Sequence, residues 1–155
     1  MSHNRLLSLS RTLFFALAAI LVFAGRSAFA GDVSWTTNFS QAKSQAASEK
    51  KLVLLDFTGS DWCPWCIKMD KEVFDQKAFA DFATNKLVLV KLDFPQSKKQ
   101  PAAEKAQNTE LAKEFNIEGF PTYVLLDASG KEVRRQVGYL PGGPSEFIKW
   151  AESKD

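Results

Sequence analysis

Trp62-Cys63-Pro64-Trp65-Cys66 is a short segment that contains the only two cysteines of the 155-residue chain. A disulfide between cysteines three residues apart closes so short a loop that it would stabilise the fold by only about 2 kcal/mol on a chain-entropy estimate. A zinc site needs about four ligands, and besides the two thiols the chain has a single histidine. The spacing therefore predicts thiol–disulfide exchange rather than a structural crosslink or a metal site.

The N-terminal region has the pattern of a cleavable signal peptide. Two arginines precede an apolar stretch from Leu13 to Ala24, and Ala28-Phe29-Ala30 has the small-x-small form of a signal-peptidase site. The apolar stretch is shorter than the roughly 20 residues that cross a bilayer, which disfavours the alternative of a retained membrane anchor. We expect residues 1–30 to be a signal peptide and residues 31–155 to form one domain, exported to the periplasm or otherwise out of the cytoplasm.

The charge of the chain depends on this leader. Three of the 20 basic residues and none of the 18 acidic residues precede residue 31, so the remaining 17 basic and 18 acidic residues give a net charge of −1. This balance does not predict a nucleic-acid partner or a lasting membrane-surface patch. We expect a monomer without a membrane span.

Hydrophobic patterning predicts alternating helices and strands. In the first half of the chain we expect a helix to about Lys50 with Ser40 as its N-cap, a strand over 52–57, a helix from Cys63 to about Phe74, a short helix over Phe79 and Phe82, and a strand over 87–90. In the second half we expect a helical segment through Leu111 and Phe115, a hairpin of strands 122–126 and 132–137, and a closing helix with Ser145 near its start. Residues 31–39 and 95–108 show no regular pattern. This order predicts an α/β fold with a central sheet and helices on both faces.

Cys63 is the predicted nucleophile of the pair. The attacking species in disulfide exchange is a thiolate, and a free cysteine with a pKa near ~8.5 is mostly protonated at neutral pH. Cys63 stands at the start of the expected helix, where unpaired backbone N–H groups favour an anion, and Pro64 suits the first helical turn. Cys66 lies one turn further along, on the apolar face of that helix. We expect Cys66 to be the more buried thiol and to resolve the mixed disulfide.

Three segments together resemble the thioredoxin family: Leu54-Leu55-Asp56-Phe57, Trp62-Cys63-x-x-Cys66 and Phe120-Pro121-Thr122. The resemblance covers nearly all of residues 31–155, and it extends to exported thioredoxin-like proteins and the periplasmic thioredoxin-like domain of thiol:disulfide interchange proteins. It implies a thioredoxin-like fold with a mixed sheet, an exposed nucleophile at Cys63, a resolving thiol at Cys66, and a cis-proline at Pro121 that faces them. The alternative for Pro121 is an ordinary loop proline.

The resemblance also implies a role for Asp56, which matches the family's buried acid. A desolvated carboxyl has a raised pKa and can take the proton from Cys66. Six residues separate Asp56 from Cys63, one more than in thioredoxin itself, so a solvent-facing acid at a strand end is the alternative. Lys91 matches the family's strand lysine near that acid.

The expected substrate-binding residues surround the cysteines: Trp62, Pro64, Trp65, Phe120 and Thr122. Large aromatic rings beside a reactive thiol can contact partner proteins, although shielding of the site is an alternative role. The backbone at Phe120 could pair with an extended substrate as an added strand. Pro64-Trp65 differs both from the Gly-Pro of thioredoxin and from the histidine-containing pair of strong oxidants in this family.

These observations predict a thiol–disulfide oxidoreductase of the protein-disulfide reductase type. We expect no bound cofactor other than the redox-active Cys63–Cys66 disulfide; the partners would be protein thiol or disulfide substrates and an upstream thiol–disulfide electron donor. The only histidine precedes residue 31, and Asp61 and Asp70 near the cysteines oppose the helix dipole, so no side chain adds to the stabilisation that the helix start gives the thiolate. This favours reduction over disulfide formation or isomerisation.

Two other functions remain as alternatives. A non-catalytic thioredoxin-like adaptor could dock a partner through the surface of Trp65 and Phe120, or through residues 95–108, which are otherwise expected to form a solvated loop. A copper chaperone is disfavoured because residues 31–155 contain too few ligands for that metal.

Overall fold

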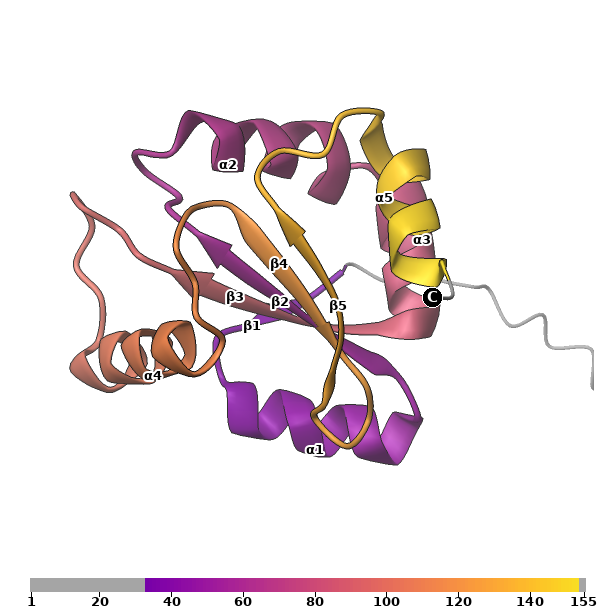
Figure 1. Ribbon diagram of the computed structural model, residues 1–155, viewed down its shortest axis with the longest axis horizontal. Coiled ribbons are helices and arrows are strands. Elements are labelled where there is room, and N and C mark those ends of the chain that lie inside the picture. Colours follow the sequence, from indigo (N-terminus) through magenta and orange to yellow (C-terminus); the bar gives the residue numbers. More distant parts are fainter. Residues whose placement is uncertain (1–32, 154–155) are drawn as a thin grey trace, which may run out of the picture.

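Strand β2 (Leu52–Thr58) lies at the centre of a five-stranded sheet with the order β1-β3-β2-β4-β5. The computed structural model describes residues 33–153 (Figure 1), so the predicted signal peptide of residues 1–30 lies outside the described residues. β1 (Trp35–Thr36) and β3 (Leu87–Asp93) run parallel within the sheet, as do β2 and β3. β4 (Thr122–Leu126) and β5 (Glu132–Val137) form an antiparallel hairpin against β2. The predicted mixed sheet is confirmed.

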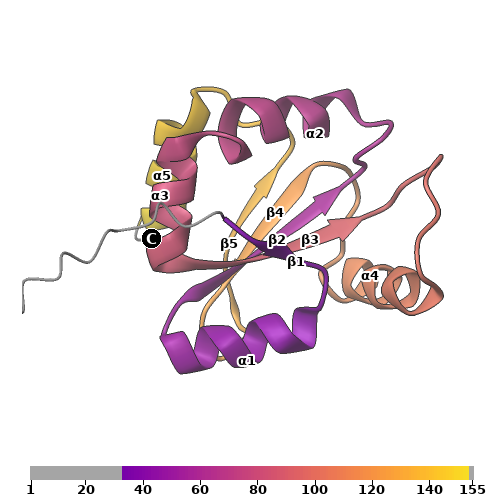
Figure 2. The same cartoon turned by 180° about the vertical axis from the view of Figure 1, so that it is seen from behind.

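Helices cover both faces of this sheet, as predicted. They are α1 (Phe39–Glu49), α2 (Pro64–Met69), which continues as the π-helical turn η1 (Asp70–Phe74), α3 (Lys77–Lys86), α4 (Ala102–Glu114) and α5 (Gly143–Glu152). α1 and α4 lie along one side of the sheet, and α2, α3 and α5 along the other (Figures 1 and 2). Each helix between residues 33 and 153 is too short or too polar to cross a bilayer.

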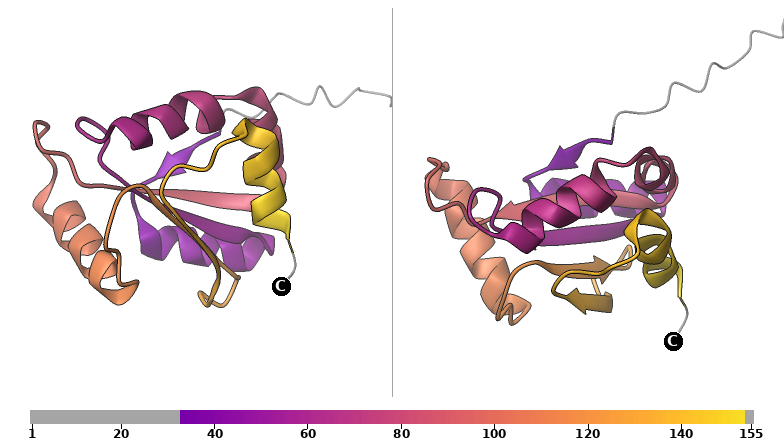
Figure 3. Two further views of the ribbon diagram at one scale, coloured as in Figure 1. Left: turned by 45° about the horizontal axis from the view of Figure 1, so that its top comes forward. Right: turned by 90° about the horizontal axis from the view of Figure 1, so that it is seen from above.

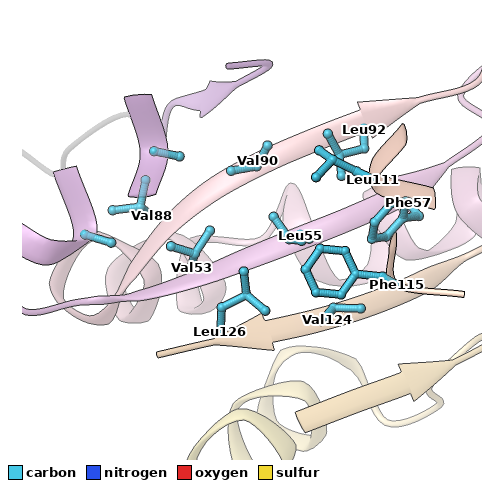
Figure 4. Close-up of a cluster of buried hydrophobic side chains, with 12 residues drawn as sticks. Val53, Leu55, Phe57, Val88, Val90, Leu92, Leu111, Phe115, Val124 and Leu126 are labelled. Carbon is cyan, nitrogen blue, oxygen red and sulfur yellow. The ribbon is translucent and has the colours of Figure 1, made fainter. Parts of the chain in front are cut away.

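Alternation along β2 separates the core into two layers. Val53, Leu55 and Phe57 point to the face of α1 and α4, where they pack with Leu111 and Phe115 (Figure 4). Leu54 points to the opposite face, whose core also contains residues from β3, β4 and the helices: Met69, Val73, Phe74, Phe79, Leu89, Tyr123 and Phe147. By the same alternation Asp56 shares the face of Leu54, which is covered by the helix that carries Cys66.

Two parts of the secondary structure differ from the prediction. α4 begins at Ala102, within the stretch for which no regular structure was expected. Its sequence lacks apolar periodicity because it lies on the surface, with only Asn108 and Leu111 buried. The two-residue strand β1, which falls in the expected lead-in of residues 31–39, is too short to leave a pattern.

The first helix also begins at a different residue. The side chain of Asn38, not that of Ser40, caps α1 by accepting a hydrogen bond from the backbone N–H of Gln41 at 2.9 Å. Both residues are good N-caps, so sequence alone does not distinguish them.

Candidate active site

The cysteines follow the carboxyl end of β2 through a tight turn. The carbonyl oxygen of Gly59 accepts hydrogen bonds from the backbone N–H groups of Trp62 and Cys63, at 3.3 and 2.9 Å. A Cβ atom on Gly59 would lie 2.5 Å from the Trp62 ring, so any larger residue at this position would have to displace that ring. β2 pairs with β3 without interruption from Leu52 to Thr58, so the turn that leads to Cys63 begins at Gly59, after the strand has ended.

Cys63 and Cys66 form a disulfide at the start of α2, with their Cα atoms 5.3 Å apart. Cys63 is the N-cap residue of α2 and Pro64 is the first helical residue, as predicted. The Sγ atom of Cys63 accepts a hydrogen bond from the backbone N–H of Cys66 at 3.2 Å. Sulfur 63 therefore lies where a negative charge would be stabilised by the helix.

The exposure of Cys63 that the resemblance implied is wrong for this oxidised state, because both cysteines are buried. Cys63 is 3% exposed and Cys66 is 2% exposed. The disulfide holds the sulfur of Cys63 against the first turn of α2, where it accepts the N–H of Cys66, and away from solvent.

Between residues 33 and 153, no three His, Cys, Asp or Glu side chains come together in a way that could hold a metal ion.

Trp62, which directly precedes Cys63, is held in place by contacts to two other segments. Its Nε1 donates a hydrogen bond to the carbonyl oxygen of Phe94 at 2.8 Å, and its ring meets that of Phe120 edge-on at 5.9 Å. Phe94 and Phe120 also pack together, with centroids 5.0 Å apart. The start of α2, the segment after β3 and the turn before β4 thus meet at one end of the sheet (Figure 3). The ring of Trp62 serves local packing while part of it stays exposed.

The Phe120–Pro121 peptide bond is cis, as the resemblance implied. The carbonyl oxygen of Pro121 accepts a hydrogen bond from the N–H of Gly138 at 2.8 Å. Thr122, expected to contact substrate, is buried, and its hydroxyl donates to the carbonyl oxygen of Gly119 at 2.8 Å. Its side chain holds the turn before β4 rather than facing a partner, because the hydroxyl is already used there.

Trp65, which directly precedes Cys66, is 54% exposed. Its ring packs on Tyr139 with centroids 5.4 Å apart, and the ammonium of Lys68 lies 4.7 Å from the Tyr139 ring centroid. The Tyr139 hydroxyl donates to the Glu72 carboxylate at 2.5 Å. Sequence reasoning missed Tyr139, since nothing in the pattern after β5 indicates that this loop returns to α2.

Asp56 is buried, and the alternative of a solvent-facing acid is wrong. It is 1% exposed, and neither of its carboxylate oxygens accepts a hydrogen bond from the described residues. The ammonium of Lys91 lies 3.6 Å from Oδ2 of Asp56 and 2.8 Å from Oδ1 of Asp70. Burial raises the pKa of Asp56 to about 7, and the charge of Lys91 opposes that rise. Asp56 is therefore poised to exchange a proton near neutral pH.

Asp61 has a structural role that the sequence did not indicate. Its carboxylate accepts hydrogen bonds from the backbone N–H groups of Gln96, Ser97 and Lys98 at 3.0, 2.7 and 3.1 Å, which lower the pKa of Asp61. Beside it, Ser60 donates from its backbone and its hydroxyl to Asp93, at 2.8 and 2.6 Å. These bonds fasten the segment after β3 to the turn that precedes Cys63.

Comparison with protein families and curated proteins gives consistent matches. A family model described as a thioredoxin-like domain matches residues 39–154. The chain is 36% identical over 124 residues to the disulfide bond reductase DsbH of Chlamydia pneumoniae, covering 80% of this chain and 74% of that protein. It is 32% identical over 135 residues to the thiol:disulfide interchange protein DsbD of Actinobacillus pleuropneumoniae, covering 81% of this chain but only 21% of that protein.

Solved structures agree with these matches. The structure of a DsbH oxidoreductase superposes with a TM-score of 0.72 at 36% identity, over 77% of this chain and 81% of that chain. The C-terminal domain of Neisseria meningitidis DsbD in its oxidised form gives a TM-score of 0.54 at 19% identity, over 77% and 97% of the two chains, and so supports the fold alone.

Proposed function

This chain belongs to the thioredoxin-like family, and we propose that it is an exported reductase that breaks disulfide bonds in protein partners. The observation that carries the proposal is the Cys63–Cys66 disulfide at the start of α2, where the sulfur of Cys63 accepts the N–H of Cys66. The same contact would stabilise a thiolate at Cys63 after reduction, because a charged acceptor strengthens the hydrogen bond.

The first step is attack of the Cys63 thiolate on a substrate disulfide. A bond forms between Sγ of Cys63 and one substrate sulfur, the substrate's own S–S bond breaks, and its other sulfur leaves as a thiolate. The partly exposed rings of Trp62 and Phe120 and the exposed ring of Trp65 are the surfaces available to contact the partner.

The second step releases the substrate. Cys66 gives its proton to Asp56, and the resulting thiolate attacks the sulfur of Cys63. The Cys63–Cys66 disulfide forms, and the remaining substrate sulfur leaves as a thiolate. Two electrons have then passed from the protein to its partner, and an upstream dithiol donor restores the reduced pair. The burial of Asp56, which raises its pKa to about 7, supports its role as the proton acceptor.

The similarity to a disulfide bond reductase supports reduction as the direction of electron flow. It does not decide that direction alone, since thioredoxin-fold proteins range in potential from about −270 mV for thioredoxin to about −120 mV for a strong oxidant. Equilibration with a glutathione buffer measures this quantity for the present pair. A value near the lower end supports reduction, whereas one near −120 mV would identify a disulfide-forming enzyme.

Reduction of insulin by dithiothreitol tests the activity directly. We expect the protein to accelerate insulin precipitation and the Cys63→Ser variant to lose this acceleration, because it has no nucleophile. A wild-type protein that gives no acceleration would contradict the proposal and favour a docking adaptor. The exported location is tested by N-terminal sequencing of the secreted protein, for which we expect Gly31 as the first residue.

A further inference from the structure

The ammonium of Lys91 lies between two carboxylates and is shared unequally by them. It donates a hydrogen bond to Oδ1 of Asp70 at 2.8 Å, whereas Oδ2 of Asp56 is 3.6 Å away, beyond hydrogen-bond distance. The side chains of Lys91 and Asp70 are partly exposed, while that of Asp56 is buried. Asp70, the more solvated acid, therefore accepts the hydrogen bond from Lys91. Asp56, the buried acid, is attracted to the Lys91 charge only from a greater distance.

The titratable groups around Asp56 come from each element packed against it. Lys91 and Asp93 lie on β3, Asp70 begins η1 above the sheet, and Tyr123 is the register partner of Asp56 on β4. Asp93 is already engaged by Ser60, and Tyr123 is a buried phenol whose pKa is raised. Asp70 is the group in this set that holds the Lys91 ammonium in a hydrogen bond.

We propose that Asp70 is a positioning residue, which holds the Lys91 ammonium away from Asp56 and so leaves the buried carboxyl free to accept a proton from Cys66. This inference rests on the proposed function, because it assigns Asp70 an effect on the proton acceptor of the second step. It also explains why the buried Asp56 carboxylate accepts no hydrogen bond from the described residues. The nearby Lys91 ammonium, which could donate one, donates to Asp70 instead.

The electrostatics of the cluster support this role. Burial is the largest influence that raises the pKa of Asp56, and the negative charge of Asp70 raises it further. Removing the charge of Asp70 would end that repulsion and release Lys91 to donate to Asp56. Both changes favour the ionised form of Asp56 and lower its pKa.

The test is the pH titration of the Asp56 carboxyl carbon by NMR in the oxidised protein. We expect Asp70→Asn to lower the midpoint by about one pH unit or more, the size typical of a gained ion pair. Asp70→Glu, which keeps the charge, should restore most of the midpoint. Asp75→Asn removes an exposed acid from the end of the same helical segment and should leave the midpoint within about 0.3 units, because exposed charges are screened.

An unchanged midpoint in Asp70→Asn would overturn the proposal, as would an equal shift in Asp75→Asn. The pH profile of insulin reduction gives a second readout, whose acidic limb should move to lower pH in Asp70→Asn by the same amount as the midpoint. The titration uses no substrate, so it supports or overturns the positioning role whatever the insulin assay shows about the proposed function.

Discussion

At the scale of single residues, the buried carboxyl of Asp56 makes the stability of the fold depend on pH. Its pKa is about 7 in the folded protein, above the ordinary value of 3.8. At a pH between these two pKa values, Asp56 is ionised in the unfolded chain but still protonated in the folded protein. The stability of the fold therefore decreases as pH rises from about 4 to 7.

The Asp56→Asn variant should not show this decrease. We expect the variant to gain stability relative to the wild type across this pH range, by up to about 4 kcal/mol above pH 7, since each pKa unit corresponds to about 1.4 kcal/mol. Urea denaturation at several pH values measures the difference. A constant difference between the two proteins from pH 4 to 8 would contradict the raised pKa.

Gly59 is a second residue whose identity is set by one contact. A Cβ atom there would lie 2.5 Å from the Trp62 ring, so Gly59→Ala must displace the ring and its hydrogen bond to Phe94. We expect a loss of about 1–3 kcal/mol in thermal unfolding, as for other overpacked sites. Gly119→Ala is the matched control, since a Cβ atom there meets nothing within 4 Å. Equal losses for both variants would show that the Trp62 contact is unimportant.

At the scale of elements, the structure shows that Asn38 and not Ser40 caps α1, a choice that the sequence alone did not decide. Asn38→Ala removes the hydrogen bond to the backbone of Gln41 and should cost about 1 kcal/mol. Ser40→Ala changes an exposed side chain inside α1 and should cost less than about 0.5 kcal/mol. Chemical denaturation of both variants measures the two costs, and a larger cost for Ser40→Ala would reverse the assignment.

The elements that could be predicted from sequence are those whose pattern reflects burial. β2 and β3 are buried runs in the sheet, and their continuous hydrophobicity indicated central strands. For α4, only the helical segment through Leu111 and Phe115 was predicted, because the first turns of the helix face solvent and carry no apolar stripe. The contacts made by Asp61 and Tyr139 join segments distant in the chain, and no local pattern encodes such contacts.

At the scale of the whole molecule, the two core layers share one sheet and should unfold together. Phe147 is fully buried and packs against the rings of Phe74, Phe79 and Tyr123. We expect Phe147→Ala to cost about 3–5 kcal/mol, a large part of the stability of a typical domain. Val137→Ala is the control, because Val137 is 62% exposed and should contribute little.

The loss in Phe147→Ala should appear as a single shifted transition. Tryptophan fluorescence and far-UV circular dichroism should report the same midpoint, because β2 and β4 contribute side chains to both layers. Separate midpoints would indicate that the layers unfold independently.

The uninterrupted pairing of β2 with β3 limits where residues can be inserted into or deleted from this protein. A one-residue insertion or deletion in β2 before Asp56 would move every later side chain of the strand to the opposite face of the sheet, and the Asp56 carboxyl would then point into the core layer that contains Phe115. The stretch from Gly59 to Trp62 lies outside the ladder and can lengthen without that inversion. Loop designs that alter the approach to the cysteines are therefore best made as insertions in this stretch that keep Gly59, Asp61 and Trp62 and their contacts.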